Sequence, residues 1–163
     1  LEGGEDPSYI CRRLVRIASE DIGLAYLHAS SICIEAWQSY ERVGSPEGDL
    51  SLARAVCYLA LAPKSNAVYT AFSDALQLAK ETGSISPPKH ILNAPTQLMK
   101  NNGYGDGYIY DHDSENAFSG QNFFPDELSR QVFYSPVERG FERELKKRLA
   151  YFEKLRSKRD KNM

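Results

Sequence analysis

The stretch Asp49-Leu-Ser-Leu-Ala-Arg-Ala-Val-Cys-Tyr-Leu-Ala-Leu-Ala62, followed directly by Pro63-Lys-Ser65, decides the fold class. On a helix of 3.6 residues per turn, its apolar residues would occupy nearly every side and leave almost no polar face. The stretch is therefore predicted to be a central helix. Pro63 ends this helix because proline cannot continue the backbone hydrogen-bond ladder. Ser65 can then cap the next helix, so an all-α fold is expected.

Three more helices are predicted around it from apolar residues at helical spacing and from capping residues. They run from about residue 7 to 20, 28 to 43 and 65 to 82. Asp6-Pro7 begins the first, since aspartate caps free N–H groups and proline is tolerated at the first helical position. Residues 1–83 are therefore expected to form a four-helix core with antiparallel packing.

The remainder of the chain has two different characters. Residues 84–135 are rich in proline, glycine and aromatic side chains, which indicates an irregular segment packed on the helical bundle, with a short helix near 96–101. Residues 136–163 carry apolar positions at helical spacing among charges and are expected to form a long C-terminal helix. All 163 residues are expected to make one domain.

Composition restricts the class of protein. The chain is 42% hydrophobic and 26% charged, which is typical of a globular domain, and no apolar run approaches the roughly 20 residues that cross a bilayer. Cys11, Cys33 and Cys57 are widely spaced, without a C-x-x-C pair, and are expected to be buried thiols. An odd number of cysteines without an export signal indicates the reducing cytoplasm. Because no apolar run is long enough to cross a bilayer, no membrane partner is expected.

Charge is distributed unevenly along the chain. Residues 138–163 hold ten basic and five acidic side chains, a net of +5, so the whole-chain charge of −2 leaves −7 for the rest. Basic side chains neutralise phosphates, so this helix is the candidate for contact with DNA or an acidic partner, although charged faces are usually only solvated. The candidate contact residues are Lys146, Lys147, Arg148, Lys154, Arg156, Lys158, Arg159 and Lys161.

No catalytic, nucleotide-binding or metal site is predicted within the chain. Pro63-Lys-Ser65 lacks the glycines of a phosphate loop, and the loop Gly103-x-Gly-x-Gly107 is not followed by a helix, as a dinucleotide fingerprint would require. Asp111-His-Asp-Ser-Glu115 lacks the spacing of a common calcium loop. The one candidate cluster for an unrecognised enzyme is Asp106, Asp111, Asp113 and Glu115.

Several motifs together resemble a known family. They are the segment 61–72 (Leu-Ala-Pro-Lys-Ser-Asn-Ala-Val-Tyr-Thr-Ala-Phe), the segment 90–100 with the glycine loop after it, Gly3-Gly-Glu-Asp-Pro7, Ala18-Ser-Glu-Asp-Ile-Gly23 and Tyr134-Ser-Pro-Val-Glu-Arg-Gly140. They look like the C-terminal region of the replication-associated recombination protein A family (RarA, also called MgsA) of AAA+ ATPases. The resemblance spans nearly the whole chain.

The resemblance implies a helical domain similar to the clamp-loader collar, which assembles the protein as a homotetramer and is itself non-catalytic. The N-terminal AAA+ module is absent from this chain, and because Leu1 is not an initiator methionine the chain is expected to be a piece of a longer protein. The parent is expected to be a cytoplasmic, nucleoid-associated ATPase that uses ATP and Mg²⁺ and is stimulated by DNA.

The parent's expected role is the maintenance, recombination and repair of replication forks. Its implied partners are DNA at forks, ends or gaps, together with single-strand-binding protein or other replisome proteins. The alternative to self-assembly is a docking module for DNA or a replisome protein through the basic C-terminal helix. A monomer with salt-sensitive binding would distinguish this alternative from a stable tetramer.

Overall fold

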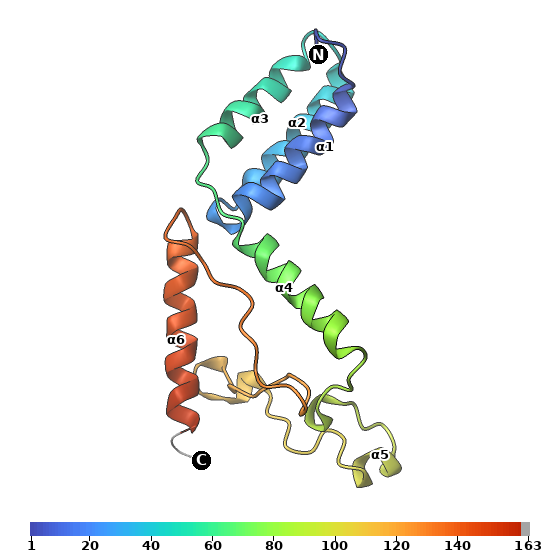
Figure 1. Ribbon diagram of the computed structural model, residues 1–163, viewed down its shortest axis with the longest axis vertical. Helices are drawn as coiled ribbons and strands as arrows, with labels where there is room; N and C mark the ends of the chain where they lie inside the picture. Colours follow the sequence, from blue (N-terminus) through green and yellow to red (C-terminus); the bar gives the residue numbers. More distant parts are fainter. Residues whose placement is uncertain (161–163) are drawn as a thin grey trace. The chain divides into compact units, whose positions relative to one another are not determined.

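The computed structural model describes residues 1–160, except for the side chain of Asp160, and these residues form helices, turns and loops with no strand (Figure 1). The expected all-α class is confirmed. The chain divides into two compact units. The first, here called the helical unit, comprises Leu1–Asp74 and Tyr134–Lys147; the second, the loop unit, comprises Ala75–Phe133 and the chain from Arg148 onward. This division differs from the expected segments 1–83, 84–135 and 136–163.

Three helices build the core of the helical unit. They are α1 (Pro7–Ile17), α2 (Ala29–Val43) and α3 (Asp49–Leu61). Asp6 caps α1 as predicted, because its carboxylate accepts hydrogen bonds from the backbone N–H groups of Ser8 and Tyr9 at 3.0 and 3.2 Å. A π-helical turn, Ala18–Ile22, continues α1 and brings Ile22 into the core.

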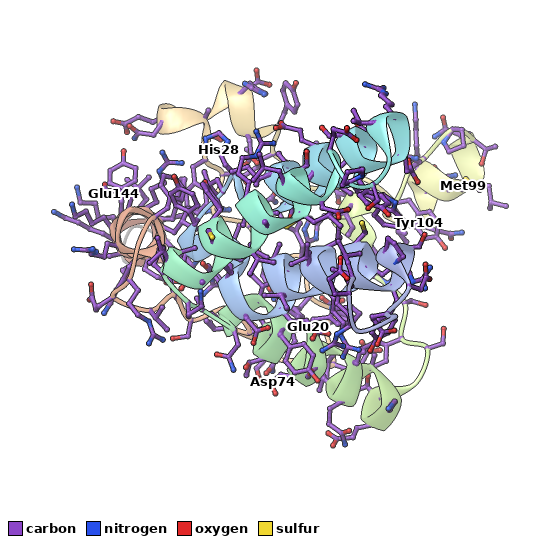
Figure 2. The ribbon with its side chains drawn as sticks, turned by 90° about the horizontal axis from the view of Figure 1, so that it is seen from above. Glu20, His28, Asp74, Met99, Tyr104 and Glu144 are labelled. Carbon is purple, nitrogen blue, oxygen red and sulfur yellow. The ribbon has the colours of Figure 1, made fainter. Side chains whose placement is uncertain are left out.

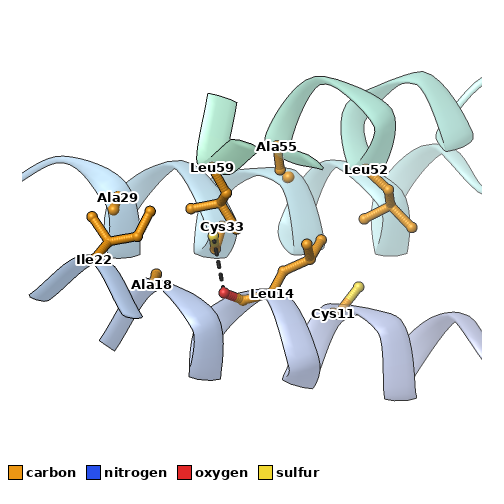
Figure 3. Packing of buried hydrophobic residues seen from close by; sticks show 10 residues of the cluster. Cys11, Leu14, Ala18, Ile22, Ala29, Cys33, Leu52, Ala55 and Leu59 are labelled. Atoms are coloured by element: carbon orange, nitrogen blue, oxygen red, sulfur yellow. Dashed lines mark hydrogen bonds between the residues drawn. The ribbon is translucent and has the colours of Figure 1, made fainter. Parts of the chain in front are cut away.

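Small side chains let these helices approach closely (Figure 3). The Cys33 thiol donates a hydrogen bond of 3.5 Å to the carbonyl oxygen of Leu14, which satisfies a buried polar group between α2 and α1. Cys11 and Cys33 are buried as predicted, whereas the prediction for Cys57 is wrong because it is exposed. The buried cluster contains Cys11, Leu14, Ala18, Ile22, Ala29, Cys33, Ala36, Leu52, Ala55 and Leu59.

The fourth helix, α4 (Ala67–Thr82), does not belong to this core. Ser65 caps it as predicted, since the N–H of Ala67 donates to Ser65 Oγ at 3.2 Å. Ala67 is nevertheless the one buried residue that α4 contributes. The expected four-helix core is thus corrected to three helices, because the apolar stripe of α4 is exposed instead of packed against them.

The loop unit is mostly irregular, as predicted, and contains the short helix α5 (Gln97–Asn101) capped by Thr96. The long helix α6 (Glu142–Asp160) begins at Glu142 and not at Pro136. The segment expected to lie on the bundle finds its partners on α6: the rings of Phe118 and Phe152 lie 4.9 Å apart between centroids. None of the helices in the described chain has the length and apolar character needed to span a bilayer.

Candidate self-association surface and basic helix

The outer face of α3 is apolar and exposed. Leu50 and Leu61 keep 75% and 88% of their surface accessible, and Arg54 is the one charged residue among the exposed positions of the helix. The central burial expected for residues 49–62 holds for only one side of the helix, formed by Leu52, Ala55 and Leu59. The other side, here called the α3 face, comprises Leu50, Ala53, Val56, Cys57, Ala60 and Leu61.

A second exposed apolar stripe lies on α4. Phe72 keeps 63% of its surface accessible, and Val68 and Tyr69 beside it are exposed as well. These three residues are here called the α4 face; Figure 2 draws the side chains of the described residues, with Asp74 labelled on this helix. Helices in proteins owe most of their stability to the packing of an apolar stripe, so a helix of 16 residues with one buried side chain lacks its usual support.

A buried carboxylate joins the Pro63–Ser65 turn to the start of α6. Glu142 is fully buried, and its Oε2 accepts hydrogen bonds from Ser65 Oγ at 2.9 Å and from the backbone N–H of Val137 at 2.7 Å. Burial, together with the Glu142 carboxylate, raises the pKa of the Tyr134 phenol far above its usual value. This junction therefore brings together two of the stretches, 61–72 and 134–140, that make the sequence distinctive.

Gly140 lets the chain pass close to the loop after α1. Its φ is +52°, and an added Cβ would collide with the carbonyl group of Ala25 and lie 2.8 Å from Pro63 Cγ. The next residue, Phe141, donates its N–H to the same Ala25 carbonyl oxygen at 2.8 Å. Only glycine fits this position without strain, and the turn that it makes delays the start of α6 to Glu142.

The candidate basic residues of the C-terminal helix differ in their surroundings. Lys146 pairs with Glu138, and Lys147 pairs with Glu144 at 2.7 Å, so the first two candidates are already held by acids of their own unit. Arg148 is exposed. Lys161 lies outside the described residues.

Arg156 and Arg159 point to the loop 118–120. Arg156 donates to the carbonyl oxygen of Gly120 at 2.8 Å and lies over the Phe118 ring, 5.3 Å from its centroid, while Arg159 donates to the carbonyl oxygen of Ser119. Lys154 and Lys158 are exposed and form no ion pair with the part of the chain described. With Arg159 they line a pocket of about 660 Å³.

The acidic and glycine-rich loops have structural roles. Asp111 Oδ1 accepts the N–H of Ser119 at 2.8 Å, and hydrogen bonds from Ser119 lower the pKa of Asp111. Within residues 1–160, no three His, Cys, Asp or Glu side chains come together as a metal site. Gly103, Gly105 and Gly107 all have positive φ, and Gly105 donates its N–H to Lys89 O at 2.9 Å, so this loop is a series of turns, as predicted.

Sequence reasoning missed His90 and Arg130 as members of a polar site. Both line a pocket of about 410 Å³ together with Arg156 and Arg159. No spacing in the sequence indicates this grouping, because the four residues come from three separate segments that only the folded loop unit brings together.

Comparison with known proteins identifies the relatives. The family model described as "MgsA AAA+ ATPase C terminal" matches residues 1–153. Replication-associated recombination protein A of Coxiella burnetii is 47% identical over 156 residues, covering 95% of this chain and 36% of that protein. The proteins of the same name from Haemophilus influenzae and Bacillus subtilis are 49% and 40% identical, covering 91% and 90% of this chain. The chain spans about a third of the length of these relatives.

Proposed function

Because this chain belongs to the MgsA C-terminal family of AAA+ ATPases, we propose that it is the homotetramerisation region of a replication-fork ATPase and is itself non-catalytic. The observation that carries this proposal is α4, whose 16 residues include one buried side chain. A second copy of the chain would supply the packing that the α4 face and the α3 face lack within one chain.

Exposed apolar surface supports association. Leu50, Leu61 and Phe72 each leave more than half of their surface in water, on helices that carry few charges on the same side. Several exposed apolar side chains on one helix face are a common feature of interaction sites, and proteins that bind themselves most often form symmetric assemblies. The number four follows from the family resemblance, and the two helix faces give the contacts through which it would form.

The parent's activities are part of the same proposal. We assign ATP and Mg²⁺ binding to the AAA+ module of the parent, and DNA at replication forks, ends or gaps to the assembled parent as its substrate. Its action in recombination and repair, stimulation of its ATPase by DNA, and contact with single-strand-binding protein or other replisome proteins belong to this proposal as well. Within the assembly this chain would hold the ATPase modules together.

A matched pair of variants tests the assembly. Phe72→Glu places a charge on the α4 face, and Leu98→Glu places the same charge at an exposed leucine of α5, where 70% of the side chain is accessible. Sedimentation velocity at several concentrations should show Phe72→Glu as smaller species and Leu98→Glu as the unchanged tetramer. If Phe72→Glu and the unsubstituted chain are both tetrameric, the α4 face is not part of the interface.

One observation favours the alternative function of DNA docking by α6. Lys154 and Lys158 are exposed, lie one turn apart and make no ion pair within the described chain. Lys146 and Lys147 offer less, because both are already paired with acids, whereas Arg156 and Arg159 donate to backbone carbonyls of the loop 118–120. Docking through α6 predicts that Lys154→Gln weakens DNA binding and reduces its dependence on salt.

A further inference from the structure

The structure assigns a phosphate-binding site to the loop unit, formed by His90, Arg130, Arg156 and Arg159. These four side chains line one pocket of about 410 Å³. A volume in the range of roughly 300–1,000 Å³ is typical of small-ligand sites. The inference does not depend on self-association, because every residue that lines this pocket belongs to the loop unit of one chain.

Two buried nitrogen atoms of this pocket have no hydrogen-bond partner among the described residues. They are Nε2 of His90 and Nε of Arg156. Buried polar groups are nearly always paired, so two unpaired nitrogens in one pocket require an explanation. The guanidinium Nε–H of Arg156 can only donate, so the group that would satisfy it must be an acceptor.

The two arginines on α6 are held in place without losing their charge. Arg156 donates to Gly120 O at 2.8 Å, and Arg159 donates to Ser119 O. Carbonyl oxygens orient a guanidinium group but carry no negative charge, so they leave its positive charge uncompensated. A guanidinium that is fixed before binding loses little side-chain entropy when an anion arrives.

Acidic groups near the pocket do not cancel this charge. Glu153 accepts a hydrogen bond from Arg130 at 2.7 Å and lies 4.0 Å from Arg156 Nε, which is too far for a hydrogen bond. Asp126 also lines the pocket but is exposed, so water screens its charge. Asp111 lines a neighbouring pocket with Arg130 and Arg156 and accepts the N–H of Ser119. The lining of the pocket itself holds three arginines and one carboxylate, so it carries a positive charge.

The donors suit a phosphate group better than a carboxylate. Three guanidinium groups and one imidazole, from three segments of the chain, line the pocket, so several donors are available to one ligand. A phosphate presents several acceptor oxygens and up to two negative charges, whereas a carboxylate presents two oxygens and one charge. The phosphate can come from a small phosphorylated molecule or from the backbone of a nucleic acid.

The three histidines of the chain provide the readout. His90 lines the pocket, whereas His28 and His112 do not, so the ring ¹H–¹³C NMR signals of those two serve as internal controls. At fixed pH and ionic strength, the chain is titrated with inorganic phosphate and, separately, with a short oligothymidylate. The His90 signal is assigned by its loss in His90→Phe. It should move saturably with at least one probe while the other two signals stay in place.

The two probes separate the sources of phosphate. Saturation by inorganic phosphate would indicate a site for small phosphorylated ligands. Saturation by the oligonucleotide at concentrations where inorganic phosphate has no effect would indicate a nucleic-acid backbone. Acetate is the comparison ligand, and an equal His90 shift with acetate would overturn the assignment to phosphate.

Substitutions check that the pocket is responsible. Arg156→Gln should weaken binding about tenfold or more, because a charge-assisted hydrogen bond is lost. Arg130→Gln should weaken binding several-fold. This variant keeps the hydrogen bonds of Arg156 and Arg159 to the loop 118–120, so its effect cannot be attributed to a disturbed loop. Lys100→Gln, an exposed residue of α5 that does not line this pocket, should change binding by less than about twofold. A His90 signal that no probe moves, or equal losses in all three variants, would overturn the proposal.

Discussion

Ser65 Oγ donates a hydrogen bond of 2.9 Å to Oε2 of Glu142, and both residues are almost completely inaccessible to water, at 2% and 0% exposure. The same carboxylate oxygen accepts the backbone N–H of Val137. One acidic side chain at the start of α6 thus holds the turn between α3 and α4. It fixes where α4 begins, and so it fixes the position of the α4 face on the helical unit.

Ser65→Ala should lower the free energy of unfolding by about 1–3 kcal/mol, because it leaves a buried carboxylate with one hydrogen bond fewer. Urea unfolding followed by circular dichroism measures this change. Ser73→Ala on the exposed side of α4 is the matched control and should change stability by less than about 0.5 kcal/mol. Equal effects of the two substitutions would contradict the role given to Ser65.

Gly140→Ala should destabilise the chain by at least about 2 kcal/mol, since the added methyl group meets the Ala25 carbonyl and Pro63 at a positive φ. Gly83→Ala separates the two causes, because Gly83 also has a positive φ, +66°, but has nothing within 4 Å of an added Cβ. Thermal unfolding should therefore show a larger loss for Gly140→Ala than for Gly83→Ala. A loss no greater than that of Gly83→Ala would mean that the contact with Ala25 is unimportant.

The free energy of unfolding should fall at alkaline pH because the Tyr134 phenol ionises more readily in the unfolded chain than in the folded one. Burial and the Glu142 carboxylate raise the pKa of this phenol in the folded state, so the unfolded chain ionises first, near pH 10. The stabilising contribution is fully present below the unfolded pKa and is lost as pH rises toward the folded pKa. Urea unfolding at several pH values above about 9 should show a steeper fall for the unsubstituted chain than for Tyr134→Phe. Parallel curves would contradict this.

Cysteine reactivity should report on the α3 face. Cys57 is exposed within one chain, whereas Cys11 and Cys33 are buried and burial raises the pKa of both thiols, so a thiol reagent should modify Cys57 first. If copies of the chain cover the α3 face, Cys57 should react faster in Phe72→Glu than in the assembled chain. Mass spectrometry of the labelled peptides measures both rates, and a Cys57 rate that does not depend on assembly would place the interface elsewhere.

Much of the helical architecture could be predicted because its signals are local. Asp6-Pro7 and Ser65 are capping residues whose hydrogen bonds the structure confirms, and apolar periodicity located α1, α2 and α3. The packing of α4 could not be predicted in this way. An apolar stripe such as Val68 and Phe72 has the same spacing whether its partner is the same chain or another one.

The start of α6 and the fate of its basic residues depended on contacts between distant segments. Pro136 looked like the beginning of a helix, but the turn at Gly140 packs on Ala25, which is far away in the sequence. Arg156 and Arg159 looked like part of a solvated basic face, yet they bind the loop 118–120. The charge pattern of the sequence predicts a charged helix, but it does not predict which backbone carbonyl groups the side chains of that helix contact.

Self-association is tested first by the mass of the purified chain in solution, measured by size-exclusion chromatography with light scattering. The measurement should be made over a tenfold range of concentration and at two salt concentrations. We expect a stable mass of four times 18.4 kDa, from an assembly that salt does not dissociate because apolar faces form its contacts. A mass of 18.4 kDa under every condition would contradict the claim that the α3 and α4 faces assemble the protein.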